Sequence, residues 1–600
     1  MRCTARGVAA PAEGAGVSRG RRALLWGIVC LAVALRFWGL SHQLPDKSYI
    51  EEDEFIYTAL KYGTGDLNPH WFFHPPLYSY ILFALYTAYY LLGSAAGWFH
   101  GSRDFILQYL IDPGPFYIIA RGASALLTIP AVLLLYALGK EVYSPRCGLA
   151  ACAFFSVMPL AVQYSHYGCT EPLLVVIVLL TALSSVRAMR TGRALPLFVA
   201  GALAGVAMGT KYTGVFSIAI LFPAAGTFRR SASWGALCGA LAASAAAFLV
   251  VCPFLILSPR EYLANVSLLL TQPLDVGEYG WVKLPNLHIA FALRYMPQGM
   301  GAAVAAACLL GLAFLWIRHR RDDILIAIIP TAFYLVIGRS RLFYDRYMLI
   351  CYPFFALAAA AFADAAVDWL TRRFFPARAG TGMMRVASTA LFAAVTAAIA
   401  IPSLISSARL VEDMIMPDTP FVAARWITAH LPAGTRILVD SAPVPQSEAS
   451  ILREQRLKEE GPRQGFAYRE KSGIYFDLQR RAARGRRGFD ITRILHPRGF
   501  HMVKGGKGYE EEWMTPELMK ARLDALGDYD YALVSAVSAG RYGEREKLPE
   551  RFRFMSDFYT SLPRKGTVVK VFSPATYPCK GPTFTLYRLG GAVRLRSLTE

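Results

Sequence analysis

Up to about residue 404, this chain of 600 residues alternates apolar stretches of about 16 to 24 residues with short charged links. A helix needs about 20 mainly apolar residues to cross the hydrocarbon core of a bilayer. Beyond residue 405 the composition becomes polar, and no segment there is long and apolar enough to cross. The pattern therefore predicts a polytopic α-helical membrane protein with a polar C-terminal part.

About eleven apolar stretches are predicted to span the membrane. They are residues 23–40, 117–138, 147–164, 173–189, 195–209, 213–228, 234–257, 297–317, 323–338, 347–367 and 386–404. The predicted organisation is a disordered cytoplasmic segment at 1–21, a transmembrane domain at 22–404 and a second domain at 405–600.

The net charge of +21 does not indicate nucleic-acid binding, because the basic residues form short clusters at the ends of apolar stretches. Lys and Arg accumulate in cytoplasmic links and set the orientation of the spans. All dense clusters fall inside only if residues 76–95, which contain five tyrosines, lie along the outer surface as a juxtamembrane helix. The clusters are Arg21/Arg22, Lys140/Arg146, Arg187/Arg190/Arg193, Arg229/Arg230, Arg318/Arg320/Arg321 and Arg372/Arg373/Arg378/Arg385.

This orientation places several links rich in reactive groups on the outer, non-cytoplasmic side, together with the domain that follows residue 405. They are a first outer loop at 41–116, a large outer loop at 258–296 and the short links 165–172, 209–212 and 339–346.

The first outer loop contains four consecutive carboxylates, Glu51, Glu52, Asp53 and Glu54. A short amphipathic helix is predicted to begin there, because acidic residues stabilise a helix N-terminus. That role accounts for one or two carboxylates, and the others repel one another. At a membrane surface they could hold a cation, or one could act as a base, since a low-dielectric surrounding raises a carboxyl pKa.

Two other outer links carry charge next to a span. Glu171 precedes Pro172, where it could stabilise the start of a helix or take part in chemistry. His166, in the same link, fits a packed interface better than a ligand when taken alone. Lys211 lies between two spans, where it could extend to the membrane surface or meet a phosphate.

The link 339–346 departs from the positive-inside pattern. It contains Arg339, Arg341 and Arg346, of which Asp345 can neutralise one. An outward guanidinium cluster requires an anion, and phosphate fits its fork geometry. Anionic lipid headgroups remain the alternative.

Taken in order, these elements resemble the membrane glycosyltransferases of the GT-C fold, in particular protein O-mannosyltransferases and lipid A aminoarabinose transferases (glycosyltransferase family 39-like). The elements are Asp53-Glu54, Phe73-His74-Pro75-Pro76-Leu77-Tyr78, Glu171-Pro172, the Gly-x-Lys at Lys211, Arg346-Tyr347, and the stretch 424–435 as the entry to an extracytoplasmic domain. The chain departs from these relatives at Glu171, where Asp is frequent, and at His74, where aminoarabinose transferases often have Lys.

The resemblance implies an inverting transfer of sugar from a polyprenyl-phosphate-linked donor to a hydroxyl of a protein, lipid or polysaccharide, at the outer face of a bacterial inner membrane. Asp53, Glu54 and Glu171 are the catalytic candidates, with Asp53 as the base. The candidates for substrate binding are His74, His166, Lys211, Arg339, Arg341, Arg346 and Tyr347. No cofactor is firmly implied, and a divalent cation at Glu52, Asp53 and Glu171 is an alternative that their spacing does not support.

The domain at 405–600 is predicted to be an extracytoplasmic α/β unit. The expected strands are Arg436–Val439, Tyr531–Ser535, Thr567–Phe572 and Phe584–Leu589, and the expected helices are Pro420–His430 and Pro516–Leu526.

Two other classes of protein remain open: a transporter or lipid flippase, and a non-catalytic scaffold. Transporters place ionisable residues near the bilayer midplane and often contain inverted repeats. In this sequence the acids and bases gather in the outer links, which favours the glycosyltransferase.

Overall fold

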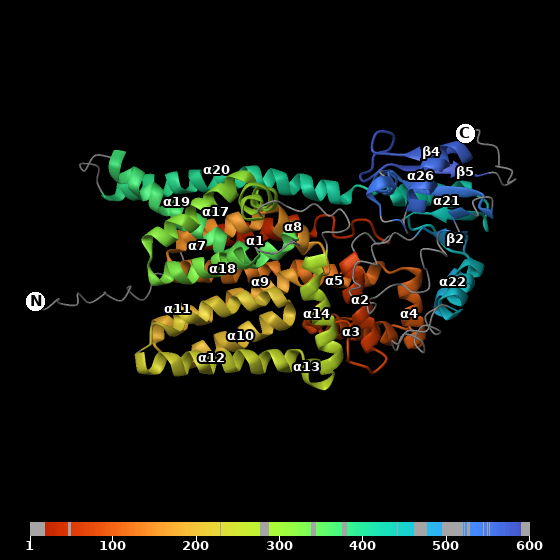
Figure 1. Ribbon diagram of the computed structural model, residues 1–600. Coiled ribbons are helices and arrows are strands. Elements are labelled where there is room, and N and C mark those ends of the chain that lie inside the picture. The colour runs from red at the N-terminus through yellow and green to blue at the C-terminus, as the bar shows by residue number, and fades with distance from the viewer. Residues whose placement is uncertain are drawn as a thin grey trace, which may run out of the picture.

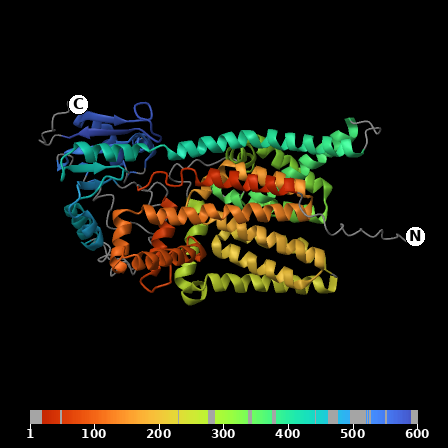
Figure 2. The same ribbon diagram turned by 180° about the vertical axis from the view of Figure 1, so that it is seen from behind.

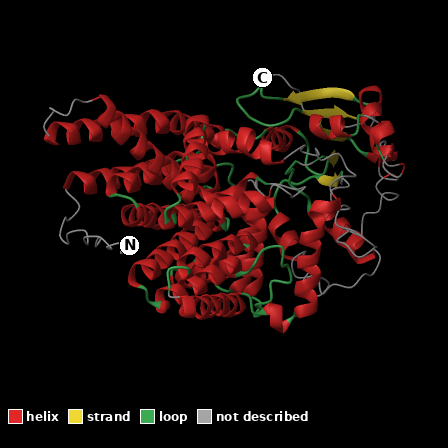
Figure 3. Ribbon diagram, turned by 60° about the vertical axis from the view of Figure 1, so that its left-hand side comes forward, coloured by secondary structure: helices red, strands yellow, loops and turns green. Residues whose placement is uncertain are grey.

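A computed structural model gives the architecture of the protein, a long helical bundle with a small mixed sheet beyond one end (Figure 1). The structure describes residues 19–45, 50–228, 230–275, 287–337, 344–374, 381–440, 442–460, 477–494, 520, 523–524, 528–543, 545–548, 550 and 553–589. Figure 3 shows the strands gathered near the C-terminus, whereas the rest of the described chain is almost entirely helix and loop.

Helices occupy every stretch that the sequence predicted to span. The bundle consists of α1 (Arg19–Phe37), α5 (Gly114–Leu126), α6 (Thr128–Val142), α7 (Pro145–Val157), α8 (Pro159–Ser165), α9 (Glu171–Thr191), α10 (Ala194–Thr210), the 3-10 helix η1 (Tyr212–Ile220), α11 (Leu221–Ala225), α12 (Arg230–Val251), α17 (Ala302–Arg318), α18 (Arg321–Ile337), the 3-10 helix η4 (Asp345–Cys351), α19 (Tyr352–Phe374) and α20 (Thr381–Ile415).

Shorter helices fill the connections. They are α2 (Ile50–Tyr62), α3 (Leu77–Ala95), α4 (Ser102–Ile111), α13 (Phe254–Leu257), α14 (Pro259–Asp275), α15 (Leu287–Ala290), the π-helix η3 (Phe291–Tyr295) and α16 (Met296–Met300). Helix α2 begins at the acidic run, as predicted, and α3 coincides with the predicted juxtamembrane helix. The position of α3 relative to a membrane stays a prediction.

Within the described residues, five helical segments are long and apolar enough to cross a membrane. They are Gly114–Val142, Glu171–Thr191, Ser233–Val251, Asp345–Phe374 and Met383–Ile415. A sixth results if α7 and α8, which are bent by 64° relative to one another, form one broken span. These segments define an integral membrane protein, while the number of about eleven spans stays a prediction.

Two of the predicted basic clusters pair with acids at helix ends. Arg190, in the last turn of α9, lies 2.8 Å from Asp322 at the start of α18. Arg146, at the start of α7, lies 2.8 Å from Asp368 near the end of α19. Glu171 begins α9, so it stands at the opposite end from Arg190. Glu171 and Arg190 therefore lie at opposite ends of α9, and which membrane face each end meets stays a prediction.

The other end of the bundle carries α2, α3 and α4 together with the C-terminal sheet. Figures 1 and 2 show both groups beyond the same end, with the long helix α20 leading from the bundle to the sheet. The first predicted outer loop and the predicted extracytoplasmic domain thus lie on one side of the bundle.

The C-terminal region contains a five-stranded sheet in the order β2-β1-β3-β5-β4. Strands β1 (Arg436–Val439), β2 (Asp490–Arg493) and β3 (Tyr531–Ser535) are parallel, whereas β4 (Thr567–Phe572) and β5 (Phe584–Arg588) are antiparallel. The accompanying helices are α21 (Thr419–His430), α22 (Glu448–Glu460), α25 (Ala536–Arg541), the 3-10 helix η7 (Arg545–Lys547) and α26 (Arg553–Lys565).

Four of the strands and helix α21 lie where the sequence predicted them. The edge strand β2 was not predicted, because Ile491 is the one apolar residue in its sequence Asp-Ile-Thr-Arg. Successive side chains of a strand point to opposite faces of the sheet. Ile437 and Leu533 therefore belong to the core on one face, and Leu438 belongs to the core on the other. Most of the predicted helix Pro516–Leu526 lies outside the described residues.

Small residues allow α10 and α12 to approach closely. Gly201 faces the backbone of Ala240, and Gly205 faces the backbone of Ser244, so closely that an added Cβ at either glycine would clash with a carbonyl oxygen. Close approach through small residues is typical of helix pairs in membranes, where water provides no driving force for association. The packing of α10 against α12 fixes the C-terminal end of α10, which Lys211 follows.

We expect Gly205→Val to lower the stability of the detergent-solubilised protein by about 1–3 kcal/mol, because the new side chain forces α10 and α12 apart. The effect is measured as a change in melting temperature, obtained from the fraction of protein that stays monodisperse after heating to a series of temperatures. Gly235→Val is the matched control, since Gly235 lies on α12 with open space around it. Equal melting temperatures for the two variants would contradict the proposed packing.

Candidate active site

A buried carboxylate between two cations forms the centre of the candidate site. Glu171 is the first residue of α9, and its side chain is almost completely buried. The Lys211 ammonium forms an ion pair with Glu171 Oε1, and Arg346 Nε lies 3.7 Å from the same oxygen. The three groups sum to one positive charge. A buried cluster with surplus positive charge can accept a phosphate.

Local backbone structure brings these groups together. Lys211 follows α10 in an extended conformation and separates α10 from η1, which packs back against α10. Arg346 belongs to η4, just before α19. Two tyrosines flank the cations, with the Tyr347 ring centroid 5.3 Å from Lys211 Nζ and the Tyr344 ring centroid 4.5 Å from Arg346 Cζ. Aromatic faces at such distances stabilise cations.

Asp53 in α2 is held by two phenols. Tyr109 in α4 donates a hydrogen bond of 2.6 Å to Asp53 Oδ1, and Tyr117 in α5 donates one of 3.1 Å to the same oxygen. Two donors on one oxygen fix the plane of the carboxylate. The sequence analysis assigned no role to either tyrosine.

His74 connects the first outer loop with the charged cluster. Its Nε2 lies 3.9 Å from Glu54 Oε2, and its ring packs against Phe55. Burial, and then the positive charge of Lys211, lower the pKa of His74 to about 3. The ring is therefore neutral near pH 7, so it can offer a phosphate one N–H donor and no charge.

Glu52, next to Asp53, is engaged in a different contact. Its carboxylate forms a two-pronged ion pair with Arg121 of α5, with both N–O distances 2.9 Å, and both side chains are completely buried. The sequence analysis treated α5 as an apolar span and missed Arg121. A lone arginine inside an apolar stretch could have revealed it, because such residues normally have a partner or a function.

The remaining predicted site residues differ in their surroundings. His166 is completely buried, with Nδ1 2.9 Å from the Val162 carbonyl oxygen and Nε2 2.9 Å from that of Trp38, which matches a packed interface. Arg339 and Arg341 lie outside the described residues.

The carboxylates suggested for a divalent cation have separate partners. Glu52 pairs with Arg121, and Glu171 pairs with Lys211. Throughout the described residues, no group of three His, Cys, Asp or Glu side chains is arranged to hold a metal ion. The arrangement of these side chains does not fit the suggested cation site.

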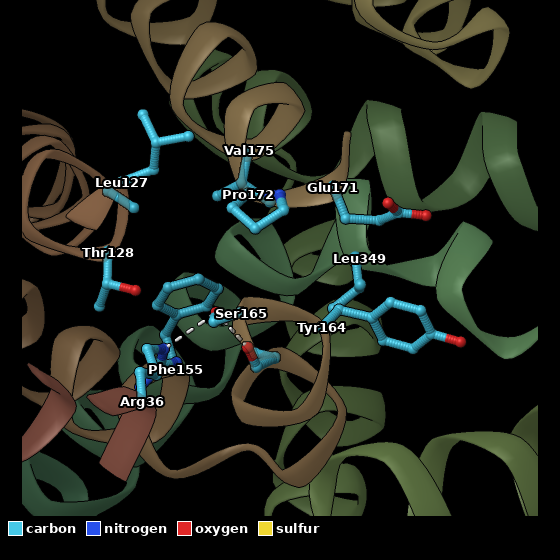
Figure 4. A pocket seen from close by; sticks show the side chains of 12 residues that line it. Arg36, Leu127, Thr128, Phe155, Tyr164, Ser165, Glu171, Pro172, Val175 and Leu349 are labelled. Carbon is cyan, nitrogen blue, oxygen red and sulfur yellow. Dashed lines mark hydrogen bonds between the residues drawn. The ribbon is translucent and has the colours of Figure 1, made fainter. Parts of the chain in front are cut away.

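A small cavity of about 20 Å³ lies behind Glu171, on the side facing α1. Figure 4 shows Glu171, Pro172 and Arg36 among its lining side chains, with Arg36 bonded to Ser165. The Arg36–Ser165 hydrogen bond is 3.2 Å long. Such a volume accommodates about one water molecule, so this cavity is too small for a sugar.

The fold defines the class: the chain has the fold of the GT-C membrane glycosyltransferases, which confirms the predicted resemblance. The sequence model of the dolichyl-phosphate-mannose-protein mannosyltransferase family matches residues 118–257. That segment includes Arg121, Glu171 and Lys211, and it excludes Asp53 and Arg346. The sequence matches none of the curated proteins with which it was compared.

Solved structures extend the likeness over almost the whole chain. The apo structure of ArnT from Cupriavidus metallidurans superposes with a TM-score of 0.53 at 12% identity, covering 95% of this chain and 98% of ArnT. The structure of the same protein bound to undecaprenyl phosphate superposes with a TM-score of 0.52 at 11% identity, covering 95% of this chain and 98% of ArnT. The archaeal oligosaccharyltransferase AglB from Archaeoglobus fulgidus, in complex with an inhibitory peptide and a dolichol-phosphate, gives 0.50 at 11% identity, covering 94% of this chain and 74% of AglB. At these identities the likeness shows the fold.

The loop that carries His74 is linked to α14 through an ion pair between His70 and Glu261. His70 Nδ1 lies 2.9 Å from Glu261, and His70 Nε2 lies 2.9 Å from Asp66. Although partial burial acts in the opposite direction, hydrogen bonds with Asp66 and Glu261 raise the pKa of His70 above 6.5. Protonated His70 therefore joins two carboxylates and holds the loop near the charged cluster.

We expect the stabilising effect of the His70 ion pairs with Asp66 and Glu261 to depend on pH. Because the pKa of His70 is raised on folding, its stabilising effect is complete below pH 6.5 and is lost as the pH rises through the raised value. The difference in melting temperature between the wild type and His70→Gln should therefore shrink from pH 6 towards pH 9. His100→Gln is the control, since His100 is 85% exposed. A difference that grows with pH would contradict the assignment.

Proposed function

We propose that the protein transfers a sugar from a polyprenyl-phosphate-linked donor to an acceptor hydroxyl at the outer face of the membrane. The observation that carries this proposal is the buried Lys211–Glu171–Arg346 cluster, which lies at the bundle end where α2 presents Asp53. Such a cluster can stabilise a leaving phosphate, and this is often the largest contribution to catalysis. ArnT and AglB, which share the fold, are described with undecaprenyl phosphate and dolichol-phosphate bound.

The proposed reaction is a single displacement. The acceptor hydroxyl oxygen forms a bond to the anomeric carbon while the bond from that carbon to the phosphate oxygen breaks, which inverts the carbon. Asp53 takes the hydroxyl proton. Polyprenyl phosphate leaves with the bonding electron pair, and Lys211 and Arg346 neutralise its charge.

The other predicted residues have supporting roles in this proposal. Glu54 orients the acceptor or sugar, and neutral His74 donates a hydrogen bond to the phosphate. Glu171 orients the two cations. Tyr347 packs beside Lys211. Arg339 and Arg341 belong to the same outer link as Arg346 and are proposed to assist with the phosphate.

The C-terminal domain at 405–600 is proposed to position the acceptor on the extracytoplasmic side. Its support is the contact between Arg486 and the carbonyl oxygen of Ile111, 3.3 Å apart, which joins this domain to the end of α4. Helix α4 also supplies Tyr109, which binds Asp53.

A transporter or flippase is the alternative class. The charged cluster lies at one end of the bundle, whereas transporters place their ionisable sites near the bilayer midplane. Proteoliposomes that translocate a polyprenyl-phosphate sugar without cleaving it would favour the transporter.

We expect Asp53→Asn to reduce sugar transfer by about 10²- to 10⁴-fold, because the amide cannot accept the proton. The measurement is release of undecaprenyl phosphate by the purified protein from a panel of undecaprenyl-phosphate sugars, with and without a membrane extract as acceptor source. Asp104→Asn, an exposed carboxylate on α4, is the control and should leave turnover unchanged. Undiminished turnover in Asp53→Asn would remove Asp53 from the mechanism.

We expect Lys211→Met to weaken binding of undecaprenyl phosphate by about 10- to 100-fold, because a charge-assisted contact is lost. Tryptophan fluorescence or thermal-shift titration with undecaprenyl phosphate measures the dissociation constant. Lys140→Met, at the opposite end of the bundle, is the control and should bind like the wild type. Equal affinities for the two variants would contradict a phosphate site at Lys211.

A further inference from the structure

The Glu52–Arg121 pair makes more contacts than a simple ion pair. Arg121 Nη1 also donates to the carbonyl oxygens of Leu40 at 3.0 Å and His42 at 2.9 Å. Glu52 Oε1 accepts a hydrogen bond of 2.7 Å from the Gly168 backbone N–H. The pair therefore joins four segments: α2, α5, the turn after α1 and the loop before α9.

Its neighbours on α5 contact the same loops. Tyr117, one turn before Arg121, donates to Asp53 at 3.1 Å. Ser124, one turn after Arg121, accepts a hydrogen bond of 3.3 Å from the Cys169 backbone N–H. Residues three or four apart lie on the same helix face. One face of α5 thus binds both helix α2, which carries Asp53, and the loop that leads into Glu171.

The second loop has little freedom to move. A Cβ on Gly168 would lie 2.6 Å from the Cβ of Ala120, so the loop rests directly on α5. Glu171 follows Gly168 by three residues. Any displacement of Gly168 is therefore transmitted to the start of α9 and to the carboxylate that binds Lys211.

A buried ion pair is a poor way to gain stability, because apolar residues of similar size often serve as well or better. Its two-pronged geometry and directed backbone contacts instead fix the relative positions of the segments it joins. Glu52 contacts Arg121 and Gly168 and is covalently next to Asp53, so its side chain couples α2 to the loop before α9.

We propose that Glu52 and Arg121 are positioning residues, which set the placement of Asp53 relative to Glu171 and the two cations. This inference rests on the proposed glycosyl transfer. Neither side chain contacts substrate in this scheme. A displacement of reacting groups by about 1 Å can cost about 10²-fold in rate, so loss of the pair acts mainly on turnover.

The test uses the full-length protein in detergent with the undecaprenyl-phosphate sugar on which the wild type is active. We expect Glu52→Gln and Arg121→Lys each to lower kcat by about 10²-fold per folded molecule. The dissociation constant for undecaprenyl phosphate should stay within about threefold of the wild-type value, because Lys211 and Arg346 are retained. Arg121→Lys keeps the charge but cannot make the fork, so it separates geometry from charge. Glu141→Gln, an exposed carboxylate at the opposite end of the bundle, is the control.

A single variant with an unpaired buried charge can fail to fold, so the double variant Glu52→Gln/Arg121→Gln completes the set. It removes both charges, and we expect it to fold and to bind undecaprenyl phosphate with kcat still low. Wild-type kcat in the folded double variant, or in Arg121→Lys, would overturn the positioning role. A wild type that neither binds undecaprenyl phosphate nor releases it from any donor would contradict the proposed function instead.

Discussion

Charge buried at the end of an apolar bundle requires a partner, and this requirement organises the candidate site. Glu171 is almost inaccessible to solvent, and a carboxylate there is tolerable because Lys211 and Arg346 approach the same oxygen. Lys211 follows α10 and Arg346 precedes α19, so the pairing fixes three helix ends at once. The connections at this end are consequently held by polar contacts, whereas the middle of the bundle is held by apolar packing.

The sequence was sufficient for the parts of the fold that depend on local composition. Stretches of apolar residues become helices wherever they occur, since a backbone in lipid must satisfy its hydrogen bonds internally. Strands β1, β3, β4 and β5 were predicted because each contains several β-branched or aromatic residues. The edge strand β2 was missed because Ile491 is its one apolar residue, and it pairs in parallel with β1. The charge pattern predicted that Glu171, Lys211 and Arg346 lie in links on one side of the bundle, and the structure brings these three side chains together.

Contacts between distant segments could not be predicted in this way. Glu52 and Arg121 are 69 residues apart, and the sequence around neither residue indicates that the other is its partner. Asp53 was predicted as a base, but the tyrosines that orient it come from α4 and α5 and resemble ordinary interface residues. Four consecutive carboxylates looked redundant in the sequence. In the structure three of them have different neighbours: Glu52 pairs with Arg121, Asp53 accepts hydrogen bonds from two phenols, and Glu54 approaches His74.

Helix α5 serves two physical demands within 13 residues. Its apolar positions pack in the bundle, while Tyr117, Arg121 and Ser124 contact α2, which carries Asp53, and the loop before Glu171. A fold can be kept at 11% identity because apolar packing tolerates substitution, as the likeness to ArnT illustrates. Function resides in sites placed on such folds, and it requires directed contacts that tolerate far less change. A helix that performs both tasks links the placement of the reacting groups to the packing of the bundle itself.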